Sequence, residues 1–291
     1  MHDHNHSHGS SERIGWAFFL NISFTILEFI GGWLTNSTAI MADAVHDLGD
    51  TLSIGSAWLL DKLSGKQANK SFTYGYRRFS LLGALINGFV LVVGSVWVLS
   101  EAIPRLSNPE MPMVEGMLGF AIFGILVNGF AAYKLSKGET LNERVLNWHL
   151  LEDVLGWVAV FIVSVVLMFV ELPILDPLLS IFFTLFILFN VVKNLVATVR
   201  LFLQAVPEHL NRDEIEESIL ALPGGGSVHH MHLWSLDGEH NVLTAHLVMH
   251  HEMAIDDIKE LKFQVRNVLN KFYLEHTTIE IELIEEECRD E

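Results

Sequence analysis

Six hydrophobic stretches, each about 20 residues long or longer, fill the first two thirds of the chain. An α-helix needs roughly 20 apolar residues to cross the hydrocarbon core of a bilayer. The chain of 291 residues is 51% hydrophobic and only 18% charged, a composition typical of membrane proteins. The sequence therefore predicts an α-helical membrane protein with six transmembrane helices. We place them at residues 14–36, 38–62, 79–103, 113–135, 146–170 and 174–202.

The last part of the chain has the character of a small soluble domain. Its apolar residues alternate in some segments and follow helical spacing in others, with Asp237-Gly238 as a turn signal. The predicted order αββαβ indicates a C-terminal two-layer α+β domain. The predicted elements are a helix to about residue 221, strands 228–236 and 242–250, a helix 254–273 and a strand 277–284. We therefore divide the chain into a His-rich flexible tail (1–12), a transmembrane domain (13–205) and a C-terminal domain (206–291).

The charges exclude one class of partner and suggest an orientation. The net charge is −17, and residues 207–291 carry 19 Asp and Glu against 6 Lys and Arg. Nucleic-acid binding needs a basic surface, so nucleic acid is not expected as a partner.

The loops at 63–78 and 134–145 hold most of the Lys and Arg residues between spans. By the positive-inside rule, both termini are predicted to lie in the cytoplasm.

Two His-xxx-Asp steps, His46 to Asp50 and His149 to Asp153, lie inside predicted spans. Residues four apart share one face of a helix, so each step presents an imidazole beside a carboxylate. Ionisable groups within a membrane persist where they face a partner, a water-filled path or an ion. Together the steps supply two nitrogens and two carboxylates, a set that suits tetrahedral Zn²⁺ but does not exclude Co²⁺ or Ni²⁺.

Further acidic residues accompany these steps. Asp43 and Asp47 continue the polar stripe of the second span, and Glu152 lies beside Asp153. Without a metal, like-charge repulsion and poor solvation favour protonation of buried carboxylates. Metal binding in turn releases protons. A site that holds either Zn²⁺ or protons, and opens alternately to each side of the membrane, would exchange one for the other.

Several segments give the chain a resemblance to the cation diffusion facilitator family, in its zinc-transporting bacterial branch. They cover nearly the whole chain, and the paired His-xxx-Asp steps are the most specific of them. The segments are ADAVHDLGD (42–50), YGYRRFSLLGALING (74–88), LNWHLLEDVLGWV (146–158), DPLLS (176–180), VHHMHLWSLDG (228–238) and LTAHL (243–247).

The resemblance implies a homodimer in the bacterial inner membrane that exchanges cytosolic Zn²⁺ for protons. It assigns the transport ligands to the second and fifth helices, and it implies a ferredoxin-like cytoplasmic domain that dimerises and binds zinc. A His at the first ligand position is associated with a preference for zinc over cadmium. Asp43 and Asp47 become candidates for the access path. The loop after the second helix has no His or acidic residue, so the extra metal site of some relatives is expected to be absent. The ligand assignment by motif is His46, Asp50, His149 and Asp153.

The C-terminal domain contains a second candidate zinc site. The resemblance points to His229 and His246, and more loosely to His276 and Glu282. His232, His250 and His251 are further candidates, or ordinary surface histidines. Cys288 is the single cysteine and can form neither an internal disulfide nor a CxxC site, so no thiolate site is predicted.

The N-terminus and the overall function leave alternatives open. His2, His4, His6 and His8 alternate with other polar residues, which indicates either weak metal binding or a solvated tail.

Two other functions are alternatives to transport. A metal-gated channel would use the membrane His-xxx-Asp pairs only as a pore lining. An intramembrane zinc-dependent enzyme would need an open coordination position, which four protein ligands do not leave. No enzymatic activity is therefore predicted.

Overall fold

The computed structural model describes residues 7–64, 68–135, 141–284 and 286–288. The chain divides into two compact units. One comprises Met1–Gly65 and Gly83–Leu195, and the other Lys66–Leu82 and Val196–Glu291. The loop after the second long helix and the end of the sixth therefore belong with the C-terminal unit.

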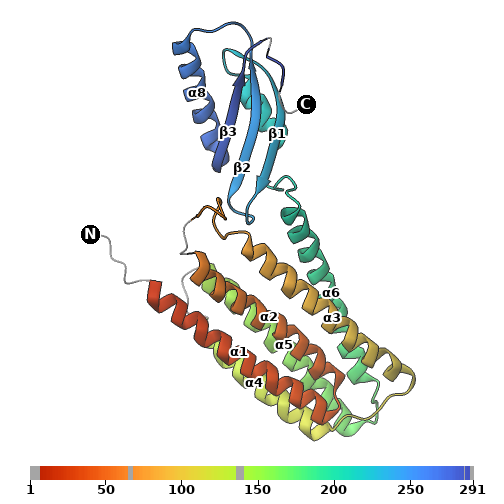
Figure 1. The fold of residues 1–291 in the computed structure, drawn as a ribbon. Coiled ribbons are helices and arrows are strands. Elements are labelled where there is room, and N and C mark those ends of the chain that lie inside the picture. The colour runs from red at the N-terminus through yellow and green to blue at the C-terminus, as the bar shows by residue number, and fades with distance from the viewer. Residues whose placement is uncertain (1–6, 65–67, 136–140, 285, 289–291) are drawn as a thin grey trace. The chain divides into compact units, whose positions relative to one another are not determined.

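Six long helices run through the described residues, as the sequence predicts (Figure 1). They are 22 to 29 residues long, about 33–44 Å at 1.5 Å per residue, which is enough to cross a bilayer. Two start earlier than predicted, because hydropathy marks only the apolar part of a helix. Their bounds are α1 Ser7–Thr35, α2 Thr38–Ser64, α3 Phe79–Ser107, α4 Val114–Leu135, α5 Leu141–Phe169 and α6 Leu175–Phe202.

The helix α2 is the most polar of the six. Among the described residues, the other five contain a stretch long and apolar enough to span a membrane, whereas α2 falls short. Its 27 residues include four aspartates and a lysine. The outward faces of the other helices carry large exposed apolar side chains such as Phe89, Phe130 and Leu155. Such a surface suits lipid rather than water, and the chain is an integral membrane protein.

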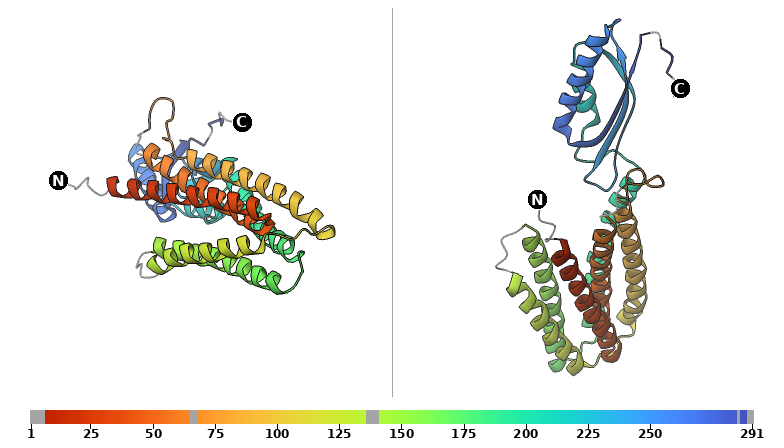
Figure 2. Two further views of the ribbon diagram at one scale, coloured as in Figure 1. Left: turned by 90° about the horizontal axis from the view of Figure 1, so that it is seen from below. Right: turned by 60° about the vertical axis from the view of Figure 1, so that its left-hand side comes forward.

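Four of the six helices pack in two pairs within the first unit, which we call the membrane unit. Helix α1 lies along α2 and α4 lies along α5, and α1 also meets α4 (Figure 2). The centre of the α4–α5 pair is Trp157, which is 1% exposed. Its indole lies against Gly124, where a β-carbon would overlap the ring. This glycine therefore sets how closely the two helices approach each other.

The first turn of α2 is tied to the first turn of α6. The carboxylate of Asp176, 1% exposed, accepts hydrogen bonds from the backbone of Thr38 (2.7 Å) and Ala39 (3.3 Å). It also accepts from the hydroxyls of Ser37 (2.6 Å) and Thr38 (2.8 Å). Ser180, one turn further along α6, donates to the carbonyl of Thr38 at 2.9 Å. An acidic side chain thus caps the free N–H groups at the start of a neighbouring helix.

The C-terminal unit has the predicted αββαβ order and the fold class that the sequence indicates. In its sheet β2 is central, antiparallel to β1 and parallel to β3. Both helices cover one face of the sheet, and their apolar residues form a core with alternate residues of β2. The elements are α7 Arg212–Leu220, β1 Gly225–Ser235, β2 Asn241–Met249, α8 Ile255–Leu269, a short 3₁₀ turn Asn270–Phe272 and β3 Leu274–Glu282.

The turn between β1 and β2 contains the predicted Asp237-Gly238 pair. Gly238 has a φ of +105°, which favours glycine. The Asp237 carboxylate accepts from the backbone N–H groups of Glu239 (3.0 Å) and His240 (2.9 Å) and lies 2.6 Å from the His240 ring. Burial alone would raise the pKa of Asp237, but these contacts outweigh it and lower the pKa below its usual value.

We expect Gly124→Ala to lower the thermal stability of the membrane unit, because the added methyl must displace the rigid Trp157 indole. Overpacking of this kind costs about 1–3 kcal/mol. Gly129→Ala is the matched control, since its β-carbon would meet nothing within 4 Å. Thermal unfolding in detergent measures both variants. Equal melting temperatures for the two would contradict the packing described here.

We expect Asp237→Asn to loosen the β1–β2 turn in a pH-dependent way. Because the folded pKa is lowered, the stabilisation is present above the unfolded value of about 3.9 and is lost as the pH falls through the folded pKa. Amide hydrogen exchange over residues 235–241, corrected for intrinsic rates, should be faster in the variant at pH 7. The difference should shrink below about pH 4. A difference independent of pH would show that the carboxylate charge is not responsible.

Candidate metal sites

The structure brings the polar stripes of α2 and α5 together. His46 and Asp50 are one turn apart on α2, and Asp153 lies on α5. The His46 Nε2 atom is 3.7 Å from an Asp50 oxygen and 3.7 Å from an Asp153 oxygen. The three side chains are mostly buried, with exposed fractions of 23%, 27% and 11% in that order. One imidazole and two carboxylates from two helices therefore share one small polar region.

The other predicted members of this group lie close by. Asp43 and Asp47 are buried on the same stripe of α2, at 8% and 6% exposure. His149 falls within α5 one turn before Asp153, but its side chain lies outside the described residues. Thus α2 contributes a continuous line of three acids and one histidine to the interior of the bundle.

A carboxylate that the sequence analysis missed joins this group from α1. Glu28 is 1% exposed, and its carboxyl group interacts with that of Asp47. It lies within electrostatic reach of Asp43, Asp47 and Asp153. The signal was present in the sequence, because Glu28 is a single acid in the middle of an apolar span.

A cavity of about 300 Å³ opens beside the α2–α5 group. Asp43, His46, Glu152 and Asp153 form its polar side. Its apolar wall includes phenylalanines of α6, at positions 182, 183 and 186. The histidine and the carboxylates thus border a shared free volume.

A second group forms in the C-terminal unit on the sheet face opposite the helices. The apolar residues Leu243 and Leu247 of β2 face the core, so the alternate residue His246 faces the other way. His229 of β1 is paired directly with His246, and Glu282 of β3 is paired with the residue two positions beyond it. Three neighbouring strands thus contribute one donor each.

The distances in this second group are short. The His246 Nδ1 atom is 2.7 Å from a Glu282 oxygen, and His229 Nε2 is 3.2 Å from the other oxygen of that carboxylate. His246 and Glu282 are buried, at 7% and 4% exposure. Cys288, which sequence reasoning had set aside, lies 3.5 Å from His246 Nδ1. One donor atom from each of these four residues lies within 4.8 Å of the others.

A β-bulge in β1 keeps this face in register. His229 pairs with His246 and His232 pairs with Thr244, so two residues of β1 stand opposite one of β2. His230, in the bulge, has a φ of +46°. The extra residue lets Val228 and Leu233 both face the core although they are five positions apart. The sequence pattern alone does not reveal this bulge.

The structure places the predicted ligand His276 away from this group. It lies six residues before Glu282 on β3, roughly 20 Å along the strand. Its half-exposed ring packs edge-on against Tyr74, with centroids 5.2 Å apart. In the described part of the chain, the group that gathers around Glu282 does not include it.

The other histidines named as candidates from the sequence are exposed or fall wholly or partly outside the described residues. His232, His250 and His251 are exposed, and His2, His4 and His6 fall outside the described residues. Of His8 only the backbone, in α1, is described.

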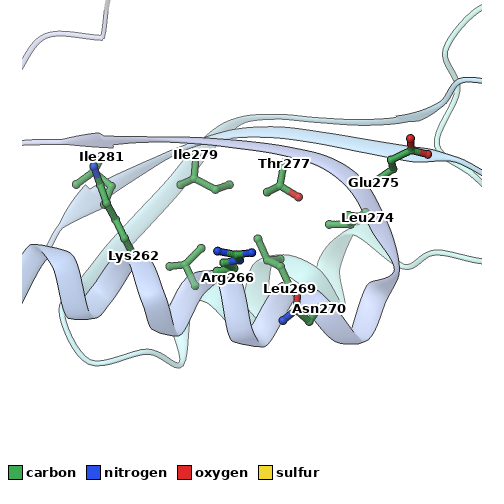
Figure 3. A pocket seen from close by; sticks show the side chains of 10 residues that line it. Lys262, Arg266, Leu269, Asn270, Leu274, Glu275, Thr277, Ile279 and Ile281 are labelled. Atoms are coloured by element: carbon green, nitrogen blue, oxygen red, sulfur yellow. The ribbon is translucent and has the colours of Figure 1, made fainter. Parts of the chain in front are cut away.

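A larger cavity of about 500 Å³ lies between α8 and β3 (Figure 3). Thr277, Ile279 and Ile281 of β3 and Lys262 and Arg266 of α8 line it. These β3 residues alternate with Glu280 and Glu282, so the cavity is on the sheet face away from the histidines. Its charged side chains are two cations, Lys262 and Arg266, and one carboxylate, Glu275, a set that does not suit a metal ion.

Two family models match the chain. The model for the cation efflux transmembrane domain matches residues 16–203, and that for the cytoplasmic domain of cation efflux proteins matches residues 207–284. The chain therefore belongs to the cation efflux family, the cation diffusion facilitators, which are membrane transporters of metal cations. The resemblance seen in the sequence is confirmed.

Curated relatives match over almost their whole length. The chain is 33% identical to a cadmium, cobalt and zinc/H(+)-K(+) antiporter of Bacillus subtilis, covering 96% of this chain and 91% of the relative. It is 30% identical to the metal cation efflux system protein CzcD of Cupriavidus metallidurans, covering 97% and 90%. It is 31% identical to the zinc transporter ZitB of Escherichia coli, covering 96% and 92%.

Among solved structures, the metal-bound C-terminal domain of the CzcD transporter matches with 35% identity and a TM-score of 0.23. That match covers 25% of this chain and 100% of the solved chain.

We expect Glu28→Met to raise the thermal stability of the membrane unit, because it removes a buried carboxyl group that lies among other acids. Taking an ionisable group out of water beside groups of like charge is costly. Glu101→Met on α3, where the glutamate is exposed, is the matched control and should change little. Melting temperatures in detergent test this. A loss of stability in Glu28→Met alone would mean that Glu28 has a stabilising partner.

Proposed function

We propose that this protein exports Zn²⁺ from the cytoplasm in exchange for protons, by alternating access, through a site formed by His46, Asp50, His149 and Asp153. The observation that carries the proposal is the position of His46 Nε2, 3.7 Å from oxygens of both Asp50 and Asp153. Residues more than 100 positions apart thus meet in a helical bundle. The fourth ligand, His149, is assigned from its helical spacing to Asp153.

The charge of the ligand set supports a divalent cation as the substrate. Two carboxylates neutralise a 2+ ion, and neutral imidazoles complete a tetrahedral shell without adding charge. Oxygen-only sets suit Mg²⁺ or Mn²⁺, whereas mixed imidazole and carboxylate suits Zn²⁺, with Co²⁺ as a related substrate. The relatives' names include zinc, cobalt and cadmium, which agrees with this chemistry.

Proton exchange follows from the acids around the site. Asp43, Asp47 and Glu28 are buried near the ligands, and all of these groups would repel one another as anions. When Zn²⁺ leaves, protons restore neutrality, and when Zn²⁺ returns they are released. The cavity lined by Asp43, His46 and Asp153 supplies space for either ion beside the ligands.

We further propose a homodimer in a bacterial inner membrane with both termini in the cytoplasm. The basic loops at 63–78 and 134–145 support this orientation. The C-terminal unit matches a cytoplasmic domain model, which supports its placement and its role in dimerisation. In this unit His229, His246 and Glu282 would bind a regulatory or structural Zn²⁺, which His276 lies too far away to join.

Transport in reconstituted vesicles tests the proposal. Proteoliposomes with an acidic interior should accumulate Zn²⁺ above its external concentration, because protons leaving the vesicle drive the exchange. A channel would only equilibrate Zn²⁺. We expect Asp50→Ala and Asp153→Ala each to abolish the uphill flux. Zn²⁺ entry is measured with a fluorescent indicator trapped inside the vesicles.

The matched control is Asp256→Ala, which removes an exposed aspartate of α8 and should transport normally. Circular dichroism and Zn²⁺ binding to the C-terminal unit should be the same in all variants, which shows that they fold. Normal uphill flux in Asp50→Ala or Asp153→Ala would overturn the site assignment. Flux that dissipates a gradient but never builds one would overturn antiport.

A further inference from the structure

Residues 286–288, which follow β3, lie back against the sheet. After β3, the side chain of Glu286 accepts a hydrogen bond from the backbone N–H of Leu283 at 2.9 Å. The backbone N–H of Glu286 donates in return to the carbonyl of Leu283 at 3.1 Å. This turn reverses the chain, and Cys288 then lies against β2, with its Sγ atom 3.5 Å from His246 Nδ1.

The donors that surround Cys288 lie close to one another, and one of them has an unsatisfied atom. His229 Nε2 is buried and forms no hydrogen bond, although it points toward the Glu282 carboxylate. His246 and Glu282 are buried on a sheet face that no helix covers. Buried polar atoms normally have partners, and an unsatisfied one calls for an ion or another explanation. For His229 Nε2, a bound ion would be that partner.

The four donor types match one kind of ion. Two imidazoles, a carboxylate and a thiolate form a tetrahedral set for Zn²⁺, whose ligand bonds of 2.0–2.3 Å imply donor separations of roughly 3.3–3.8 Å. The four atoms already lie within 4.8 Å of one another. Side-chain adjustments of about an ångström would close them around an ion. The thiolate makes this site softer than the His and Asp site in the membrane, which favours Zn²⁺, Cd²⁺ and Co²⁺.

We propose that Cys288 is the fourth ligand of the C-terminal metal site and that the bound metal fastens the segment that carries Cys288 against this face of the sheet. This deepens the proposed function, because it rests on metal binding by His229, His246 and Glu282. The position of the segment that carries Cys288 then depends on the metal. The segment covers the site when the metal is bound and releases Cys288 to solvent when the metal leaves.

Cobalt spectroscopy tests the sulfur ligand directly. Because the chain has one cysteine, a thiolate-to-cobalt charge-transfer band in the near ultraviolet can arise only from Cys288. Reduced, full-length protein in detergent, loaded with Co²⁺, should show this band. Cys288→Ser should lose it and should retain Zn²⁺ at this site at least about 10-fold more weakly. Glu287→Gln, the matched neighbour, should keep both properties.

Alkylation tests whether the position of the segment that carries Cys288 depends on the metal. Zn²⁺ should slow the reaction of Cys288 with iodoacetamide at least about 10-fold, and Glu282→Gln should remove most of this protection. A wild-type protein that binds Co²⁺ but shows no charge-transfer band, or equal alkylation rates with and without Zn²⁺, would overturn the proposal.

The transport site serves as a separate control. Asp50→Ala should keep the sulfur band while losing transport, and Cys288→Ser should keep transport at saturating Zn²⁺. Failure of this inference and failure of the proposed transport function are therefore distinguishable.

Discussion

The burial of several acids within a lipid-spanning bundle is the constraint on which the rest of the membrane unit depends. Asp43, Asp47, Glu28 and Asp153 come from three helices and converge near His46. As anions in a medium of low polarity they would repel one another and lose their hydration, which is costly. Such an arrangement is stable only with compensating positive charge, whether protons or a metal ion. Repulsion among these carboxylates destabilises the empty site. The same need for positive charge explains how the site would exchange one cation for another.

The two candidate sites differ in ways that suit different tasks. The membrane site lies beside a cavity and has oxygen and nitrogen donors only, so an ion there can enter and leave. The C-terminal site is built on paired strands, with a buried carboxylate and a sulfur atom at the chain end. Strands hold donors more rigidly than loops do, and a thiolate binds Zn²⁺ strongly. Transport needs the first kind of site, and retention of a regulatory ion needs the second.

The sequence was sufficient for most of the fold because the signals were local. Hydropathy located the helices, and alternation located the strands, within a few residues. The joining of α2 and α5 was inferred from two His-xxx-Asp steps, and the described residues agree for His46, Asp50 and Asp153.

Long-range features were harder to predict. A loose alignment favoured His276, because strand register decides which residues of β3 reach His246, and register is not visible in one strand. Cys288 was dismissed because cysteine pairs were the pattern sought, and the turn at Leu283–Glu286 that returns it to the sheet depends on tertiary contacts. Glu28 was overlooked although its position in an apolar span was informative.

The four hydrogen bonds that Asp176 accepts fix the N-terminal end of α2 against α6. At that end α2 cannot slide or rotate against α6 without leaving a buried carboxylate unsatisfied. A change of access at His46, two turns further along, therefore requires α2 to pivot about this point or to carry α6 with it. If α2 pivots, its displacement increases along the helix toward Ser64. There α2 leads into the loop that belongs to the C-terminal unit.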